Sequence, residues 1–225
     1  MDEGFRLVGL EDGAVLISTD ADARPPVHWV SANLRAIARG ADLVGGALRL
    51  DPVEPIDPAV ARLRRLWDLY WATVRRIEDQ YDPRAWDPSP RHGDHTGASL
   101  AIRAECYRDA GGLPPIPTGE DRALVASAEA TGARLRHPLD VWTYVSPRLD
   151  GRASAGMAQD MARLAREALT GDAPRAPHWT HWQLRKQENG ARLIAELEPR
   201  LAPMPHDARL DDLLTPSSLN RAEAA

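Results

Sequence analysis

Two carboxylates one residue apart carry the clearest chemical signal in this chain. Asp20 and Asp22 come directly after the apolar segment 14–18, which predicts a short buried strand. Carboxylate oxygens suit Mg²⁺ or Mn²⁺, and these ions in turn suit the phosphates of a substrate. The competing interpretation is structural, with Asp20 capping the turn after the strand and Asp22 pointing into solvent. The position after a buried strand favours a metal site.

A second acidic pair, Glu120 and Asp121, is placed where it could supply a general base. The pattern predicts a helix that begins at about these residues, runs to Thr131 and has Thr118 as its N-cap. A carboxylate can abstract a proton when burial and neighbouring groups set its pKa suitably. Carboxylates in a first helical turn also complement the helix dipole. For this motif taken alone, the structural role is the preferred interpretation.

Histidine and arginine side chains supply further candidates. His137 ends a short predicted strand, where a neutral imidazole could be a third metal ligand. Arg148 and Arg152 could hold a diphosphate, although arginines on a surface are usually only solvated. His92 and His95 lie in a proline-rich loop without a cysteine partner, so we expect no metal site there.

The elements that would position these residues alternate between strands and helices. Segment 14–18, a helix over 27–39 and a second strand over 42–50 predict a right-handed parallel βαβ unit. The carboxyl edge of a parallel sheet is where α/β proteins bind ligands. The helix carries an apolar stripe expected to pack on the sheet, and a longer helix is predicted over 57–80. The stripe consists of Val27, Val30, Leu34 and Ile37.

Composition excludes several classes of protein. The 225 residues include 28 Lys and Arg and 33 Asp and Glu, which gives a net charge of −5 and argues against a nucleic-acid binder. A single cysteine, Cys106, excludes an internal disulfide framework. No segment approaches the roughly 20 apolar residues that a transmembrane helix needs, and the acidic start shows no signal peptide. We therefore expect a cytoplasmic protein without a transmembrane segment.

The composition changes after Gly151, where helical or loose segments follow. We expect an α/β domain over residues 1–153 and a helical extension with a polar tail over residues 154–225.

Taken in order, the motifs resemble those of a family-2 glycosyltransferase with the GT-A fold. The resemblance covers about residues 8 to 160, and its strength lies in the order of the motifs. They are Thr19-Asp20-Ala21-Asp22-Ala23-Arg24-Pro25-Pro26, Gly45-Gly46, Gly97-Ala98-Ser99-Leu100-Ala101-Ile102-Arg103 with Tyr107 and Gly111-Gly112, Gly119-Glu120-Asp121, and Ser146-Pro147-Arg148 with Gly151-Arg152-Ala153.

The resemblance implies a partial GT-A (Rossmann-like) mixed sheet flanked by helices, within the α/β class. It also implies metal-dependent, inverting transfer of a sugar from a nucleotide-diphosphate sugar to an acceptor hydroxyl. Asp20 and Asp22 would hold Mn²⁺ or Mg²⁺ on the diphosphate, and Asp121, with Glu120 beside it, would be the catalytic base. His137 corresponds loosely to a histidine that completes the metal shell in some GT-A enzymes.

The chain departs from the family pattern at its start. Only about 13 residues precede the first predicted strand, whereas the family begins with further βα units that hold the nucleotide. We therefore expect the chain to lack the N-terminal nucleotide-binding portion, and the donor and acceptor cannot be read from it.

Two other interpretations remain open. The chain could be a truncated, non-catalytic interaction module that forms a homodimer through an exposed sheet edge. A haloacid-dehalogenase-like phosphohydrolase would use Asp20 as a nucleophile. However, Arg24 stands where that family has Thr or Val, and Lys186 is the only lysine.

Overall fold

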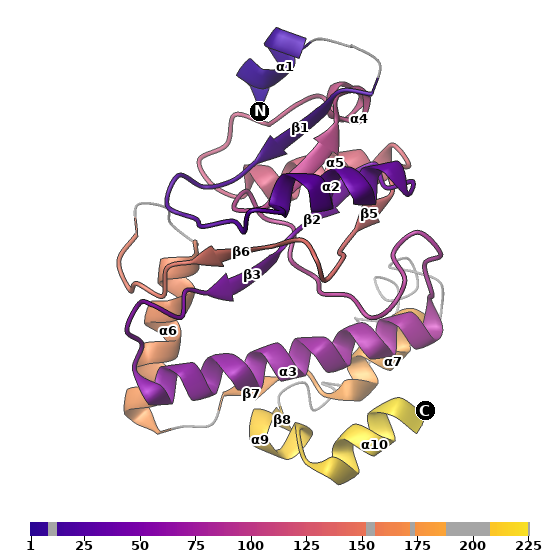
Figure 1. Ribbon diagram of the computed structural model, residues 1–225. Coiled ribbons are helices and arrows are strands. Elements are labelled where there is room, and N and C mark those ends of the chain that lie inside the picture. Colours follow the sequence, from indigo (N-terminus) through magenta and orange to yellow (C-terminus); the bar gives the residue numbers. More distant parts are fainter. Residues whose placement is uncertain (9–12, 152–155, 172–173, 188–207, 225) are drawn as a thin grey trace. The chain divides into compact units, whose positions relative to one another are not determined.

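The computed structural model describes residues 1–8, 13–151, 156–171, 174–187 and 208–224 (Figure 1). They divide into two compact units. An α/β unit comprises Met1–Pro55 and Ala85–Asp160, and a helical unit comprises Ile56–Arg84 and Met161–Ala225. This division differs from the single break expected after residue 153, because the long helix within Ile56–Arg84 groups with the C-terminal helices.

The α/β unit contains a four-stranded mixed sheet with the strand order β1-β4-β2-β5. The strands are β1 (Val15–Ser18), β4 (Leu100–Arg103), β2 (Leu43–Gly45) and β5 (Leu135–Arg136). β4 is antiparallel to both β1 and β2, and β2 is parallel to β5. The fold class is therefore α/β with a mixed sheet flanked by helices, as the sequence predicts.

The two strands of the predicted βαβ unit, β1 and β2, do not pair with each other. They run in the same direction, but β4 lies between them. The side chains of Leu100, Ala101 and Ile102 are all buried, which suits a central strand with both faces covered. Strand order depends on such long-range burial and not on the sequence around β1.

The second predicted strand, over residues 42–50, divides into two strands that belong to different sheets. β2 ends at Gly45, and β3 (Ala47–Leu50) pairs in parallel with β6 (Trp142–Val145) in a two-stranded sheet. A Cβ atom at Gly45 would collide with the backbone oxygen of Asp94 and lie 2.9 Å from the Cβ of His95. Because Gly45 has no side chain, the segment that precedes β4 can pass directly over the point where β2 ends.

Helices cover both faces of the four-stranded sheet (Figure 1). α2 (Trp29–Ala38) packs on one face, and α4 (Ala104–Asp109) and α5 (Glu120–Ala130) pack on the other. α1 (Asp2–Val8) adds Phe5 to the α4–α5 side. The core on that side contains Leu16, Leu43, Leu100, Ile102, Tyr107, Leu124, Val125, Ala128 and Leu135, and the core beneath α2 contains Trp29, Ala32, Ala36, Ile37, Ala41, Val44, Ala101 and Val141.

The predicted apolar stripe of α2 is largely wrong. Val27, Val30 and Leu34 are exposed, and only Ile37 of that stripe is buried. The side chain of Trp29 is buried instead, and its indole Nε1 donates a hydrogen bond of 2.8 Å to the Oγ of Ser99. This contact at the start of the helix turns the face of Trp29, rather than the aliphatic stripe, toward the sheet.

The helical unit is built around α3 (Pro58–Tyr81), whose bounds agree closely with the predicted helix. Asp57 is its N-cap, and its carboxylate accepts hydrogen bonds from the amides of Ala59 and Val60. The other elements are α6 (Met157–Thr170), which begins in the α/β unit, β7 (Arg175–Ala176), α7 (Trp179–Gln187), β8 (Ala208–Arg209), α9 (Leu210–Leu213) and α10 (Pro216–Ala224).

The core of the helical unit gathers around Tyr70. Its ring stacks on Trp179 with the ring centroids 5.0 Å apart, and its hydroxyl donates to the carbonyl of Pro177 at 2.7 Å. Trp182 donates from its indole nitrogen to the same hydroxyl oxygen. None of the helices in the described part of the chain combines the length and apolar composition that crossing a membrane requires.

The close approach at Gly45 predicts a cost for any side chain there. Gly45→Ala should destabilise the α/β unit by about 1–3 kcal/mol, because a backbone oxygen cannot move aside as a flexible side chain can. Reduced hydrogen-exchange protection of the β2 and β4 amides would measure the loss. Gly4→Ala is the matched control. Gly4 lies in α1, and a Cβ atom there would make an ordinary contact of 3.5 Å with the side chain of Leu16. Equal effects of the two substitutions would contradict the prediction.

Candidate functional site

The structure brings two of the predicted acidic residues together around Gly97. The Asp121 Oδ2 atom accepts a hydrogen bond of 2.7 Å from the amide of Gly97. A Cβ atom at Gly97 would lie 3.8 Å from this oxygen and 3.9 Å from Asp20 Oδ1. The two carboxylates therefore approach the same glycine, although one follows β1 and the other begins α5.

The pairing of β1 with β4 explains how Asp20 reaches Gly97. The antiparallel register sets Ser18 opposite Leu100, so the residues after β1 lie beside those before β4. Thr19 extends this alignment, because its hydroxyl donates to the carbonyl of Ala98 at 2.9 Å. Asp20 is the next residue along the chain.

The start of α5 positions Asp121. The helix begins at Glu120, and its N-cap is Gly119, with a φ of 79°, and not the predicted Thr118. A left-handed conformation of this kind favours glycine, because it has no Cβ atom. Asp121 Oδ1 accepts from the amide of Arg122 at 2.7 Å. Each oxygen of the Asp121 carboxylate thus accepts one backbone N–H group.

Negative charge is concentrated at Asp20. Burial raises the pKa of Asp20 above its ordinary value, and the charges of Asp22, Asp121 and Glu120 raise it further. The charges of the other three predicted acidic residues therefore all act on Asp20. Such a cluster is electrostatically costly when it is empty of cations, and a bound cation or a proton on Asp20 would relieve the repulsion.

Asp22 and Arg148 form an ion pair at the edge of this cluster. Both side chains are about half exposed, at 49% and 50%. The loop after β1, which carries Asp22, is held by β6, because the backbone of Arg24 exchanges hydrogen bonds with that of Tyr144 at 2.9 and 3.1 Å. Arg148, one of the two predicted diphosphate-binding arginines, therefore lies beside Asp22, whereas Arg152 lies outside the described residues.

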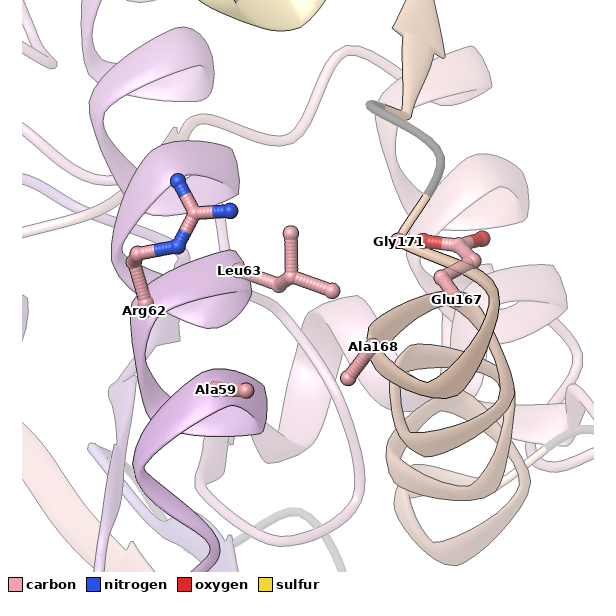
Figure 2. Close-up of a pocket in the computed structure, with 6 residues that line it drawn as sticks. All are labelled: Ala59, Arg62, Leu63, Glu167, Ala168 and Gly171. Carbon is pink, nitrogen blue, oxygen red and sulfur yellow. The ribbon is translucent and has the colours of Figure 1, made fainter.

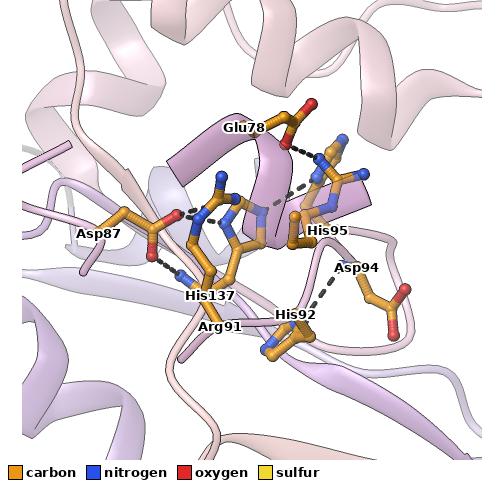
Figure 3. A network of polar contacts seen from close by, with 8 residues as sticks. Glu78, Asp87, Arg91, His92, Asp94, His95 and His137 are labelled. Atoms are coloured by element: carbon orange, nitrogen blue, oxygen red, sulfur yellow. Dashed lines mark hydrogen bonds and ion pairs between the residues drawn. The ribbon is translucent and has the colours of Figure 1, made fainter. Parts of the chain in front are cut away.

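The predicted metal shell of Asp20, Asp22 and His137 is not assembled. Among the residues that the structure describes, no three His, Cys, Asp or Glu side chains are arranged to hold a metal ion. His137 instead belongs to a network with Asp87 and His95 (Figure 3). Its Nδ1 atom lies 2.8 Å from Asp87 Oδ2, and its Nε2 atom lies 3.3 Å from His95 Nδ1. Both ring nitrogens are engaged there.

Asp87 contacts the backbone of His137 as well as its ring. The amide of His137 donates to Asp87 Oδ1 at 2.7 Å. The pKa of Asp87 is lowered, because the hydrogen bonds and charge of His137 outweigh the effect of burial. The ionised Asp87 carboxylate thus accepts from the backbone amide of His137 and lies within hydrogen-bond distance of its Nδ1 atom.

His92 and Asp94 connect the network to the sheet that contains β3. The amide of Asp94 donates to His92 Nδ1 at 3.1 Å, and its carboxylate accepts from the amide of Leu48 at 2.9 Å. Burial, followed by the charge of His137, lowers the pKa of His92 to about 4. Because these residues lie just before Gly97, the network holds the segment that carries the hydrogen bond to Asp121.

A separate pocket lies in the helical unit between α3 and α6, with Glu167 on one wall and Arg62 on the other (Figure 2). It is lined by Ala59, Arg62, Leu63, Glu167, Ala168 and Gly171. The carboxylate of Glu167 is bound by Arg163 at 2.7 Å, which neutralises its charge. This pocket does not have the concentrated negative charge of the Asp20–Asp121 cluster.

Sequence reasoning did not identify the partners of these side chains. Gly97 begins the motif Gly97-Ala98-Ser99-Leu100-Ala101-Ile102-Arg103, but nothing in its surroundings in the sequence points to Asp121. Asp87 stood in a proline-rich loop, and it contacts His137 across 50 positions. Only the arrangement of the loops around the sheet makes these contacts.

Removing one charge of the acidic cluster should lower the pKa of Asp20. Asp121→Asn retains an oxygen that can accept from Gly97 and removes one of the charges that raise this pKa. We expect a carboxyl-carbon NMR titration to show the Asp20 pKa moving toward its ordinary value. Asp140→Asn removes an acid that pairs with Arg35 and should leave the titration unchanged. An unaltered Asp20 pKa in Asp121→Asn would show that the two carboxylates do not interact.

The buried imidazole of His92 should make the α/β unit less stable in acid. Its folded pKa of about 4 lies below its ordinary value of 6.5, so the unfolded chain binds the proton more readily between these values. The stabilisation is fully present above pH 6.5 and is lost as the pH falls toward 4. Hydrogen-exchange protection of β2 and β4 should therefore fall over this range.

The variant His92→Gln should show a smaller change over the same pH range. His28→Gln, which replaces an exposed imidazole of the same unit, provides the comparison. A pH dependence that is identical in wild type and His92→Gln would assign the acid sensitivity to other groups.

Comparison with family models and with curated proteins gives no match for this chain, so its function is argued from the geometry of the Asp20–Asp121 cluster.

Proposed function

We propose that this chain is a metal-dependent glycosyltransferase. The reaction is transfer of a sugar from a nucleotide-diphosphate sugar to an acceptor hydroxyl, with inversion at the sugar carbon. The observation that supports this proposal best is the approach of Asp20 and Asp121 to Gly97. A metal-binding carboxylate and a general base must both lie near the reacting atoms, and these two residues lie near each other.

Asp121 takes the role of the general base. Its two oxygens accept from the amides of Gly97 and Arg122, so the carboxylate has a defined orientation before any acceptor arrives. In its ionised form, it would take the proton of the acceptor hydroxyl as that oxygen bonds to the sugar carbon. Glu120, the neighbouring residue, adds negative charge to the cluster.

Asp20 and Asp22 fit Mn²⁺ or Mg²⁺ as two hard oxygen ligands, with phosphate and water oxygens left to complete the coordination. The raised pKa of Asp20 is the sign of a cluster that a cation would relieve. A cation bound there would stabilise the charge that develops on the leaving diphosphate.

Arg148 would also contribute to binding of the diphosphate. In the structure its guanidinium pairs with Asp22. If the Asp22 carboxylate turns to a cation, the guanidinium becomes available to phosphate oxygens, to which it can donate two parallel hydrogen bonds. Because the pair is about half exposed, this exchange needs no rearrangement of the core.

Donor binding provides the direct test. Isothermal titration of the full chain with UDP-glucose and GDP-mannose should detect binding of at least one donor in the presence of Mn²⁺ and not in EDTA. Asp22→Ala should weaken it by about 10- to 100-fold, the value of one charge-assisted contact of about 1.5–3 kcal/mol. Asp121→Asn should retain donor binding and abolish transfer, because the base acts on the acceptor.

Asp140→Asn serves as the control for loss of one surface carboxylate in the same unit. A folded chain that binds neither donor with or without Mn²⁺ would contradict the proposal and favour an interaction module. A covalent phosphate on Asp20 after incubation with a phosphate ester would favour a phosphohydrolase instead.

A further inference from the structure

One face of the β3–β6 sheet carries aromatic rings together with arginine side chains. We call it the Arg49–Trp142 face, and it lies entirely within the α/β unit. The ring of Trp142 contacts the side chains of His28, Arg49 and Tyr144. The guanidinium of Arg24 lies over the ring of Tyr144.

Arg49 is the exposed cation of this face. Its guanidinium carbon lies 4.3 Å from the centroid of the Trp142 ring, a cation–π contact that holds the side chain over the indole. Arg24 pairs with Asp51, and Arg148 pairs with Asp22. Among the described residues, Arg49 has no carboxylate within ion-pair distance. The indole of Trp142 therefore orientates the Arg49 guanidinium, and no carboxylate in the described part of the chain neutralises its charge.

The two aromatic rings give the face an apolar component. Trp142 and Tyr144 meet edge to face, with centroids 4.8 Å apart and planes at 68°. Both side chains are only partly buried, whereas Thr143 and Val145, between and after them on the opposite side of β6, are buried. Exposed rings of this kind offer flat apolar area at a small cost in conformational entropy, and the C–H faces of a sugar ring can pack on them.

The backbone connects this face to the acidic cluster. Arg24 follows Asp22 by two residues and bridges to Tyr144 through two hydrogen bonds. Arg148, just after β6, pairs with Asp22 itself. A molecule lying on the Arg49–Trp142 face would thus extend toward Asp22 along β6.

We propose that the Arg49–Trp142 face binds the acceptor, and that this acceptor is a saccharide with a carboxylate or a phosphate group. The sugar ring packs on Trp142 and Tyr144. The anionic group accepts two parallel hydrogen bonds from the Arg49 guanidinium, which the indole has already orientated. The role as acceptor rests on the proposed function; recognition of an anionic saccharide does not.

Titrations without donor or metal test whether the chain recognises an anionic saccharide, independently of the proposed function. The full chain is titrated with trigalacturonate and glucose 6-phosphate, which distinguish the carboxylate from the phosphate, with maltotriose as the neutral saccharide and citrate as the anion without a sugar ring. We expect at least one anionic saccharide to bind more tightly than both controls. It should shift one indole N–H signal in the NMR spectrum, which Trp142→Phe identifies by removing it.

Arg49→Gln should weaken that binding by about 10- to 100-fold, the value of one charge-assisted contact. Arg39→Gln, which removes an exposed arginine at the end of α2, should not weaken it. Equal loss in both variants would show attraction to net charge alone and overturn the proposal. Absence of binding by both anionic saccharides, or equally tight binding of citrate, would also overturn it.

The same variants separate this proposal from the proposed function. Arg49→Gln should leave Mn²⁺-dependent donor binding unchanged, whereas Asp22→Ala should weaken donor binding. Saccharide binding that needs Arg49 in a chain that binds no donor would retain the anionic-saccharide site and reject the glycosyltransferase. Donor binding that needs Asp22, in a chain that binds no saccharide, would retain the glycosyltransferase and reject the anionic-saccharide site.

Discussion

The antiparallel pairing of β1 with β4 is the constraint on which the candidate site depends. This register aligns the end of β1 with the start of β4, so that Thr19 contacts Ala98 and Asp20 comes close to Gly97. The amide of Gly97 then holds Asp121 at the start of α5. A shift of the register by one residue would turn each side chain of β1 to the other face of the sheet and separate the carboxylates.

Support for this arrangement comes from two sides that do not share residues. The network of Asp87, His95 and His137 holds the segment before β4, with Gly45 leaving room for it beside β2 (Figure 3). On the other side, β6 holds the loop after β1 through the bridge between Arg24 and Tyr144. Both supports consist largely of backbone contacts and buried polar groups, which give a defined geometry more readily than exposed ion pairs do.

Local sequence patterns predicted individual helices and strands well, but they predicted poorly which elements pack against one another. The apolar periodicity of α3 placed that helix within about one residue of its observed bounds. The aliphatic stripe of α2 led to the wrong buried face, because the distant Ser99 binds Trp29 and sets the rotation of the helix. Periodicity indicates that a helix has an apolar side. A helix with aromatic and aliphatic residues on different sides has two faces that could be buried, and periodicity does not choose between them.

The sequence by itself determined the fold class, the extent of the longest helix and the places of the acidic motifs at a strand end and at a helix start, because these are local features of the chain. Only the tertiary structure decided that β4 lies between β1 and β2, that His137 pairs with Asp87 and that Arg49 lies over Trp142. These outcomes depend on burial and hydrogen bonding between residues far apart in the chain, and such contacts leave no periodic pattern in the sequence. The chemistry of the candidate site was therefore visible in its residue types, whereas its geometry was decided by their partners.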